Sequence, residues 1–174
     1  MSTEYIKRYH DEEQTILCEE YFLLNGKKEG VYKFYYYTGE LMEICNYIND
    51  IREGEFKKYL DTGELQIIYN YVNGKIEGEY KEYYNHTQQL LGIWIYVNGK
   101  KNGEYKIYHE NGQLQSIGTN VNDKKEGECK YYYPNTQLEF ICNCVNGKIE
   151  GEGKYYNDNG ELREICNFIN GIRL

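Results

Sequence analysis

Charged and aromatic side chains recur at fixed positions along this 174-residue chain. A lysine recurs every 24 or 25 residues, and a tyrosine follows each of these lysines two positions later. Residues two apart on a strand lie on one face, so in strands they would form adjacent columns. Clustered lysines could bind anionic headgroups or phosphate, and a row of tyrosines could bind a protein. The lysines are Lys33, Lys57, Lys81, Lys106, Lys130 and Lys154, and the tyrosines are Tyr35, Tyr59, Tyr83, Tyr108, Tyr132 and Tyr156.

Both columns also have a purely structural interpretation. A glutamate precedes most of the lysines by two positions, which favours exposed Lys–Glu pairs that contribute only ~0.2–1 kcal/mol each. The tyrosine rings, in turn, could pack the core of a single sheet. We expect most rings to pack and a minority to bind, with Trp94 as a further binding candidate. The glutamates are Glu55, Glu79, Glu104, Glu128 and Glu152.

The other reactive side chains form no catalytic pattern. His10, His86 and His109 are scattered, and no serine or cysteine near them completes a nucleophile motif. No glycine pattern resembles a phosphate-binding loop. Carboxylates recur with the repeat, whereas a catalytic pair should interrupt it. We therefore expect no enzymatic activity, no catalytic residue and no cofactor.

The cysteines mostly occupy positions of the repeat. Cys45, Cys142 and Cys166 share a column with Tyr69 and Trp94, as expected of small apolar core residues. Equivalent positions in adjacent repeats would be two strands, or about 9.5 Å, apart, which exceeds disulfide reach. Cys142 and Cys144 are two positions apart, but no nearby histidine completes a zinc site. We expect no metal site.

Composition limits the partners and the compartment. The net charge of −8 disfavours nucleic acid as a partner, and no apolar stretch approaches the ~20 residues of a membrane span. The first 14 residues lack the apolar segment of a signal peptide. We expect an intracellular, cytoplasmic protein with reduced thiols, located in the host cytoplasm or the virion if it is viral.

Glycine marks an internal repeat. Six glycines follow one another at 24 or 25 residues, and a fixed period of this length indicates stacked copies of one small unit. Each opens a strand-like segment, where glycine permits a positive φ, a bulge or the close approach of an aromatic ring. These structural glycines are Gly30, Gly54, Gly78, Gly103, Gly127 and Gly151.

Two turns divide each repeat into two strands. Asn-Gly or Asn-Asp begins at positions 25, 49, 73, 98, 122, 146 and 170, and Asn-Gly between strand-like runs predicts a β-hairpin. The single inserted residue falls in the second turn of the third repeat, Asn85-His86-Thr87-Gln88. We expect an N-terminal cap or tail over residues 1–14. Residues 15–174 should form about six repeats and a half repeat, with roughly thirteen or fourteen antiparallel strands.

The repeated motif Asn-Gly-Lys-x-x-Gly-x-Tyr-Lys-x-Tyr-Tyr, followed by Asn-Gly-x-Leu, resembles MORN repeats, and more closely their bacterial-type variant. The resemblance covers about residues 17–174. It implies an all-β fold, an elongated single-layer antiparallel β-hairpin array that is twisted or gutter-shaped. It also implies scaffolding, homo-oligomerisation and contacts with proteins or lipids, with no catalytic residues. The composition resembles that of proteins from large DNA viruses with AT-rich genomes, which suggests a giant DNA virus as the source.

The function expected from this pattern is a non-enzymatic scaffold that forms a homodimer and binds an unidentified protein. One alternative is an antitoxin or immunity-like protein that binds one toxin. The other is a membrane-associated tether that uses the lysine column, with lipid as the weaker partner. The chain stops within a seventh repeat, so we expect self-association to cover its last strands. The candidate residues are Phe140, Cys144, Phe168, Ile169, Ile172 and Leu174.

Overall fold

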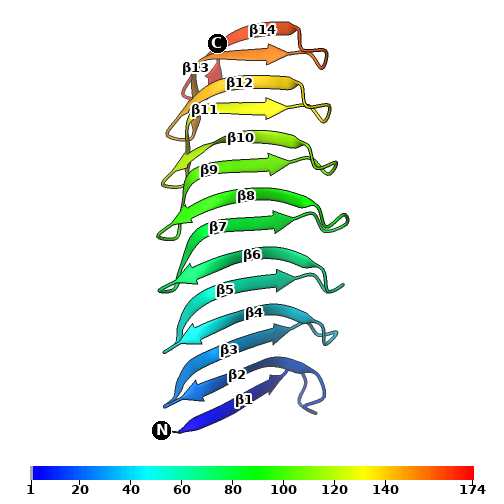
Figure 1. The fold of residues 1–174 in the computed structure, drawn as a ribbon, viewed down its shortest axis with the longest axis vertical. Helices are drawn as coiled ribbons and strands as arrows, with labels where there is room; N and C mark the ends of the chain where they lie inside the picture. Colours follow the sequence, from blue (N-terminus) through cyan, green and yellow to red (C-terminus); the bar gives the residue numbers. More distant parts are fainter. Residues whose placement is uncertain (1) are drawn as a thin grey trace. The chain divides into compact units, whose positions relative to one another are not determined.

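The computed structural model describes residues 2–174 and consists of strands joined by turns, with no helix among those residues. The chain divides into two compact units, Met1–Gln88 and Gln89–Leu174. In each unit, consecutive strands pair antiparallel, and Figure 1 shows each unit as a single layer of strands in chain order. The predicted all-β, antiparallel hairpin array is therefore confirmed.

The first unit contains seven strands and the second contains eight. The first has β1 (Thr3–Tyr9), β2 (Leu17–Leu24), β3 (Lys27–Tyr35), β4 (Leu41–Ile48), β5 (Ile51–Tyr59), β6 (Leu65–Val72) and β7 (Lys75–Tyr83). The second has β8 (Leu90–Val97), β9 (Lys100–Tyr108), β10 (Leu114–Val121), β11 (Lys124–Tyr132), β12 (Leu138–Val145), β13 (Lys148–Tyr156), β14 (Leu162–Ile169) and β15 (Ile172–Arg173).

The strand number exceeds the expected thirteen or fourteen because residues near the N-terminus also pair. Thr3–Tyr9 forms β1 along β2, within the segment that the sequence suggested was a cap or tail. Asp11 closes the following turn, where its carboxylate accepts hydrogen bonds from the backbone N–H groups of Thr15 and Ile16.

The hairpin turns follow the Asn-Gly prediction. Asn73 and Gly74 between β6 and β7 have φ angles of 50° and 75°, and Asn146 and Gly147 between β12 and β13 have 51° and 83°. Two successive positive φ angles define the turn type that matches the twist of paired strands. The inserted residue of the third repeat lies between β7 and β8, outside both strands, as predicted.

The periodic glycines are required by backbone conformation. Gly54 has a φ of +76°, and a Cβ added there would meet nothing within 4 Å. It lies where β5 slips in register against β4, so its place is a bulge and not a close contact with a ring. Gly103 differs, with a φ of +137° and an added Cβ that would lie 2.9 Å from Ile95 Cβ.

Each unit buries one face of its sheet, which we call the core face. In the first unit, Tyr21, Tyr32, Cys45, Phe56, Tyr69 and Tyr71 form the buried cluster. In the second, Cys129, Phe140, Cys142, Cys144, Cys166 and Phe168 form it. These residues alternate along the strands with the repeated lysines, so the lysine and tyrosine columns lie on the opposite face, which we call the ladder face.

Candidate interaction surfaces

Lys–Glu pairs form on the ladder face of each unit, as expected. Each lysine of the column from Lys57 onward contacts the glutamate two residues earlier on its own strand, at N–O distances of 2.5–3.1 Å. Hydrogen bonding to these carboxylates raises the pKa of each of the five lysines. Lys33 has Val31 at the earlier position and pairs with Glu20 on β2 at 3.1 Å. The lysine column therefore carries its own counter-ions.

The tyrosine column runs beside these pairs, at the ends of the odd-numbered strands. All six rings, from Tyr35 to Tyr156, are half-buried. Tyr35 is tied to the protein because its hydroxyl donates a hydrogen bond to Glu20 at 2.7 Å. Burial and this hydrogen bond raise the Tyr35 pKa. The buried core clusters contain none of the six rings, so they supply a partly exposed aromatic strip.

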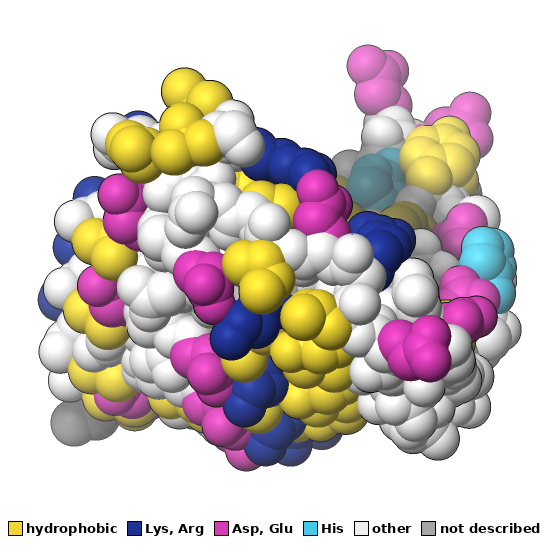
Figure 2. Space-filling view, turned by 90° about the horizontal axis from the view of Figure 1, so that it is seen from above, with side chains coloured by type: hydrophobic (Ala, Val, Ile, Leu, Met, Phe, Trp, Pro, Cys, Tyr) yellow, Lys and Arg dark blue, Asp and Glu magenta, His cyan; other side chains and the backbone are white. Residues whose placement is uncertain are grey.

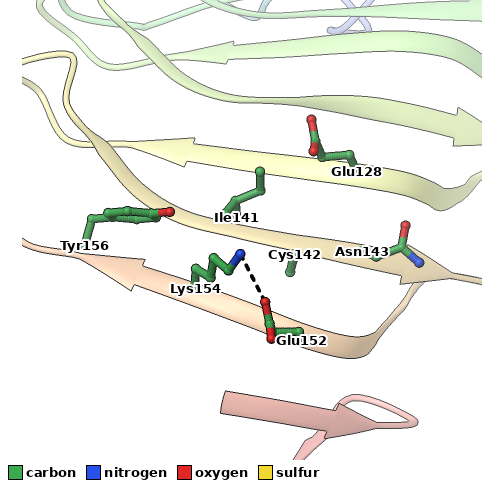
Figure 3. Close-up of a pocket in the computed structure, with 7 residues that line it drawn as sticks. All are labelled: Glu128, Ile141, Cys142, Asn143, Glu152, Lys154 and Tyr156. Atoms are coloured by element: carbon green, nitrogen blue, oxygen red, sulfur yellow. Dashed lines mark ion pairs between the residues drawn. The ribbon is translucent and has the colours of Figure 1, made fainter. Parts of the chain in front are cut away.

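Similar shallow hollows open between neighbouring repeats on this face. One, of about 300 Å³, is lined by Glu128, Ile141, Asn143, Glu152, Lys154 and Tyr156 (Figure 3). The Lys154–Glu152 pair, with an N–O distance of 3.1 Å, lies along its side. A hollow of about 300 Å³ beside Lys130 and one of about 160 Å³ beside Lys81 have related linings. The repeat thus produces recurring contact sites of nearly constant chemistry.

Trp94 does not join the tyrosine column. It pairs in register with Tyr105 on the core face, while its neighbour Ile93 pairs with Lys106 on the ladder face. The Lys101 ammonium lies 4.7 Å from the centre of the Trp94 ring. The sequence placed Trp94 in the column of Cys45 and Tyr69, and that column lies on the core face; a binding role for Trp94 stays a prediction.

The six residues expected to mediate self-association fall into two groups. Phe140, Cys144 and Phe168 are buried in the core of the second unit, where they pack and offer no surface. Ile169, Ile172 and Leu174 are exposed. Leu162 and Ile165 on β14 are also exposed, although the sequence did not single them out.

A series of contacts between repeats was missed by sequence reasoning. Tyr36 lies just after the end of β3, and Tyr133 lies just after the end of β11. The Tyr133 hydroxyl donates a hydrogen bond to the backbone carbonyl of Tyr156 at 3.0 Å, and His109 Nε2 lies 2.8 Å from that of Tyr132. The recurrence of tyrosine or histidine directly after the tyrosine column was the available signal.

A column of cations on the core face was also missed. It lies two residues before each periodic glycine, where the chain has Lys28, Arg52, Lys101 and Lys125, and isoleucine in two repeats. The Lys28 ammonium is 4.4 Å from the ring centres of both Tyr21 and Tyr32. Such cation–π contacts hold each charge over the aromatic core.

Arg52 contacts aromatic rings and also forms two side-chain hydrogen bonds. Its Nε donates a hydrogen bond to the Tyr47 hydroxyl at 3.0 Å, and its Nη1 donates one to the Tyr71 hydroxyl at 2.9 Å. Burial alone would lower the Arg52 pKa, but the two hydroxyl acceptors outweigh it and the pKa is raised. The guanidinium therefore stays charged inside an aromatic surround.

Five of the cysteines are buried in the core, whereas Cys18 is partly exposed, and none of those in residues 2–174 forms a disulfide. Cys129 lies directly opposite Cys142 on the next strand, and its Sγ is 3.4 Å from Cys144 Sγ. Sequence reasoning compared only equivalent positions of the repeat and missed these cross-strand neighbours. Burial raises the pKa of the Cys144 thiol. Across the described chain, no group of three or more His, Cys, Asp or Glu side chains is arranged to hold a metal ion.

The repeats of this chain match a known family model. A family model described as "MORN repeat variant" matches residues 28–49, 52–73, 101–122, 125–146 and 149–170. The matches leave out residues 74–100, which contain the inserted residue. The comparison with curated proteins found no match.

One solved structure aligns with most of this chain, but the two backbones superpose poorly. It is the crystal structure of a protein of unknown function from Bacteroides fragilis NCTC 9343, 12% identical, covering 96% of this chain and 94% of that one. The TM-score is 0.12, so this similarity supports no inference.

In residues 2–174, no helix is long and apolar enough to cross a membrane.

Proposed function

This chain belongs to the MORN repeat variant family, and we propose that it is a non-enzymatic scaffold that self-associates and presents its ladder face to a protein partner. The recurrence of one contact site supports this proposal most directly. Each of these hollows lies beside an isoleucine and a Lys–Glu pair, and two of the three are also lined by a half-buried tyrosine of the column, Tyr83 or Tyr156. Tyrosine-rich surfaces of this kind suit protein contacts.

The ladder face favours a protein over a lipid surface. An anionic membrane attracts unpaired lysine or arginine, whereas each lysine of the column from Lys57 onward already contacts a glutamate. The net charge of −8 adds repulsion. We expect no flotation with anionic liposomes at physiological salt. Flotation that is lost in Lys130→Gln would instead favour the membrane tether.

Partner binding is tested with the ladder face altered. Tyr132→Ala together with Tyr156→Ala removes two neighbouring rings from the strip, and Tyr37→Ala is the control because Tyr37 is 65% exposed outside the column. A protein captured by the wild type and the control, but not by the double variant, would support the proposal. A partner that binds all three equally would contradict it.

We propose that self-association uses the β14 side of the second unit. Over Leu162–Cys166, no described strand pairs with the outer side of β14, and Leu162, Ile165 and Ile169 are half exposed. Figure 2, viewed from above Figure 1, shows hydrophobic side chains among charged ones. An edge with free backbone groups and exposed apolar side chains is a template for antiparallel pairing with a second copy.

The mass in solution tests this assignment. One chain has a mass of 20.8 kDa, so we expect light scattering to give twice that value. Ile165→Lys with Ile169→Lys should return the mass to that of one chain, since a charge at the edge opposes pairing. The control is Ile48→Lys, because Ile48 is 51% exposed and holds the position of Ile169 in its own repeat. A monomeric wild type, or a dimeric double variant, would overturn the assignment.

A further inference from the structure

In the cation column of the core face, Arg52 is an arginine where the other cations are lysines. The equivalent positions hold lysine at 28, 101 and 125 and isoleucine at 76 and 149, so the fold requires no guanidinium here. At Arg52, two tyrosine hydroxyls, those of Tyr47 and Tyr71, accept hydrogen bonds from the same cation. Arg52 therefore differs from the residues at all equivalent positions of the repeat, and this difference indicates that its guanidinium has a role specific to this place in the chain.

The guanidinium keeps unused hydrogen-bonding capacity. It has five N–H bonds, of which two are engaged by the tyrosines, so three remain. Arg52 forms no ion pair with any of residues 2–174, and neither does Lys28. Both cations lie over the Tyr47 ring, with Lys28 Nζ at 5.3 Å and Arg52 Cζ at 5.9 Å from its centre. Two positive charges thus share one aromatic ring, and neither forms an ion pair with a carboxylate.

The tyrosines orient this site. Because Tyr47 and Tyr71 accept hydrogen bonds from Arg52, their own hydroxyl protons point elsewhere. The Tyr71 hydroxyl lies 2.9 Å from the Tyr69 hydroxyl, where either can donate. No other partner is found for the Tyr47 hydroxyl in residues 2–174, so its proton is available beside the free guanidinium N–H bonds.

A hollow gives a ligand access to these donors. It measures about 490 Å³, and its lining includes Tyr47, Arg52, Tyr71, Ile51 and Asn73. Its rim also carries the Asp50 carboxylate, which accepts a hydrogen bond from the Lys28 backbone N–H at 2.7 Å. Aromatic and aliphatic walls around a guanidinium are suited to an anionic group attached to an apolar body.

We propose that Arg52, with the Tyr47 hydroxyl, binds the carboxylate of a small apolar acid in this hollow. A planar carboxylate accepts parallel N–H bonds from a guanidinium. A singly charged group is favoured over a phosphate dianion, because Asp50 and the net charge of −8 repel the ligand in proportion to its own charge. This site is on the core face and does not depend on the ladder-face partner.

The test uses benzoate as the probe and compares it with inorganic phosphate at the same ionic strength. In a ¹H–¹⁵N NMR titration of the wild type, we expect saturable shifts at Arg52 Nε–H and at the Asn73 and Gly74 amides. Phosphate should bind more weakly. No saturable shift with benzoate would overturn the proposal, and equal or tighter binding of phosphate would overturn the carboxylate assignment.

Residues that the chain carries at equivalent positions of its own repeat make suitable variants, because we expect them to preserve the fold. Arg52→Ile places here the residue found at 76 and 149, and Arg52→Lys places the residue found at 28, 101 and 125. We expect Arg52→Ile to weaken benzoate binding by at least about tenfold, and Arg52→Lys and Tyr47→Phe to weaken it by less. Lys125→Ile, which removes a similarly caged cation in the second unit, should leave the affinity unchanged. Undiminished binding by Arg52→Ile would overturn the proposal.

Discussion

The hydroxyl of Tyr36 donates a hydrogen bond of 2.8 Å to the backbone carbonyl of Tyr59, in the next repeat of the first unit. The Tyr133 hydroxyl makes the same contact with Tyr156 in the second unit. A side chain at the end of one strand thus satisfies a backbone acceptor at the end of another. The contact links neighbouring repeats outside the strand ladder.

Tyr36→Phe should therefore destabilise the protein by about 0.5–1.5 kcal/mol, because it leaves a half-buried carbonyl without its donor while preserving the ring. Urea unfolding followed by circular dichroism measures this change. Tyr37→Phe is the control, since Tyr37 is exposed, and it should change the free energy of unfolding little. Equal effects of the two variants would show that the hydroxyl contact contributes nothing.

Gly54→Ala should lower the free energy of unfolding by about 1–2 kcal/mol, the cost of a left-handed backbone for a residue with a Cβ. The cost is purely conformational, since an added Cβ meets nothing within 4 Å. Gly54→Asn should cost less, because asparagine adopts this conformation more readily. The same urea measurement applies. If alanine and asparagine are equally tolerated, backbone conformation is not the reason for glycine.

Glu20 should make the stability depend on acid pH. Hydrogen bonds from the Tyr5 and Tyr35 hydroxyls and a weaker contribution from Lys33 lower the pKa of the Glu20 carboxyl from an ordinary 4.5 to about 2. Burial acts in the opposite direction but is outweighed. A carboxyl with a depressed folded-state pKa stabilises the protein fully above pH 4.5, and this contribution disappears as the pH falls through 2.

Glu20→Gln should accordingly flatten the loss of stability between these two pH values. Thermal unfolding midpoints across this range measure the slope. Glu40→Gln serves as the matched control, because Glu40 is exposed. An unchanged slope in Glu20→Gln would contradict the assignment.

Thiol reactivity should separate Cys18 from the other cysteines. Cys18 is partly exposed, whereas the remaining five cysteines are buried. Ellman's reagent should label one thiol rapidly in the native protein and all six in urea. Burial raises the Cys18 pKa above its ordinary 9.0, so the fast rate should keep rising beyond that pH. Cys18→Ser should remove the fast phase, and its persistence would mean that the core opens to the reagent.

Sequence alone determined the architecture of this protein. Asn-Gly pairs and periodic glycines act through local backbone conformation, so their spacing predicted the hairpins and the positive φ angles without knowledge of distant contacts. The same locality explains why the Lys–Glu pairs were predicted, since both partners lie two residues apart on one strand. The insertion was placed in a turn because a strand would lose register.

Tertiary structure decided which residues face one another across strands. The opposition of Cys129 and Cys142, the bond from Tyr36 to Tyr59 and the enclosure of Arg52 by Tyr47 and Tyr71 all depend on register and on the bulge at each periodic glycine. It likewise buried Phe140, which the sequence had proposed as a self-association residue. A sequence period fixes which positions are equivalent, but contacts between non-equivalent positions arise only when the sheet assembles, because they depend on the relative placement of separate strands.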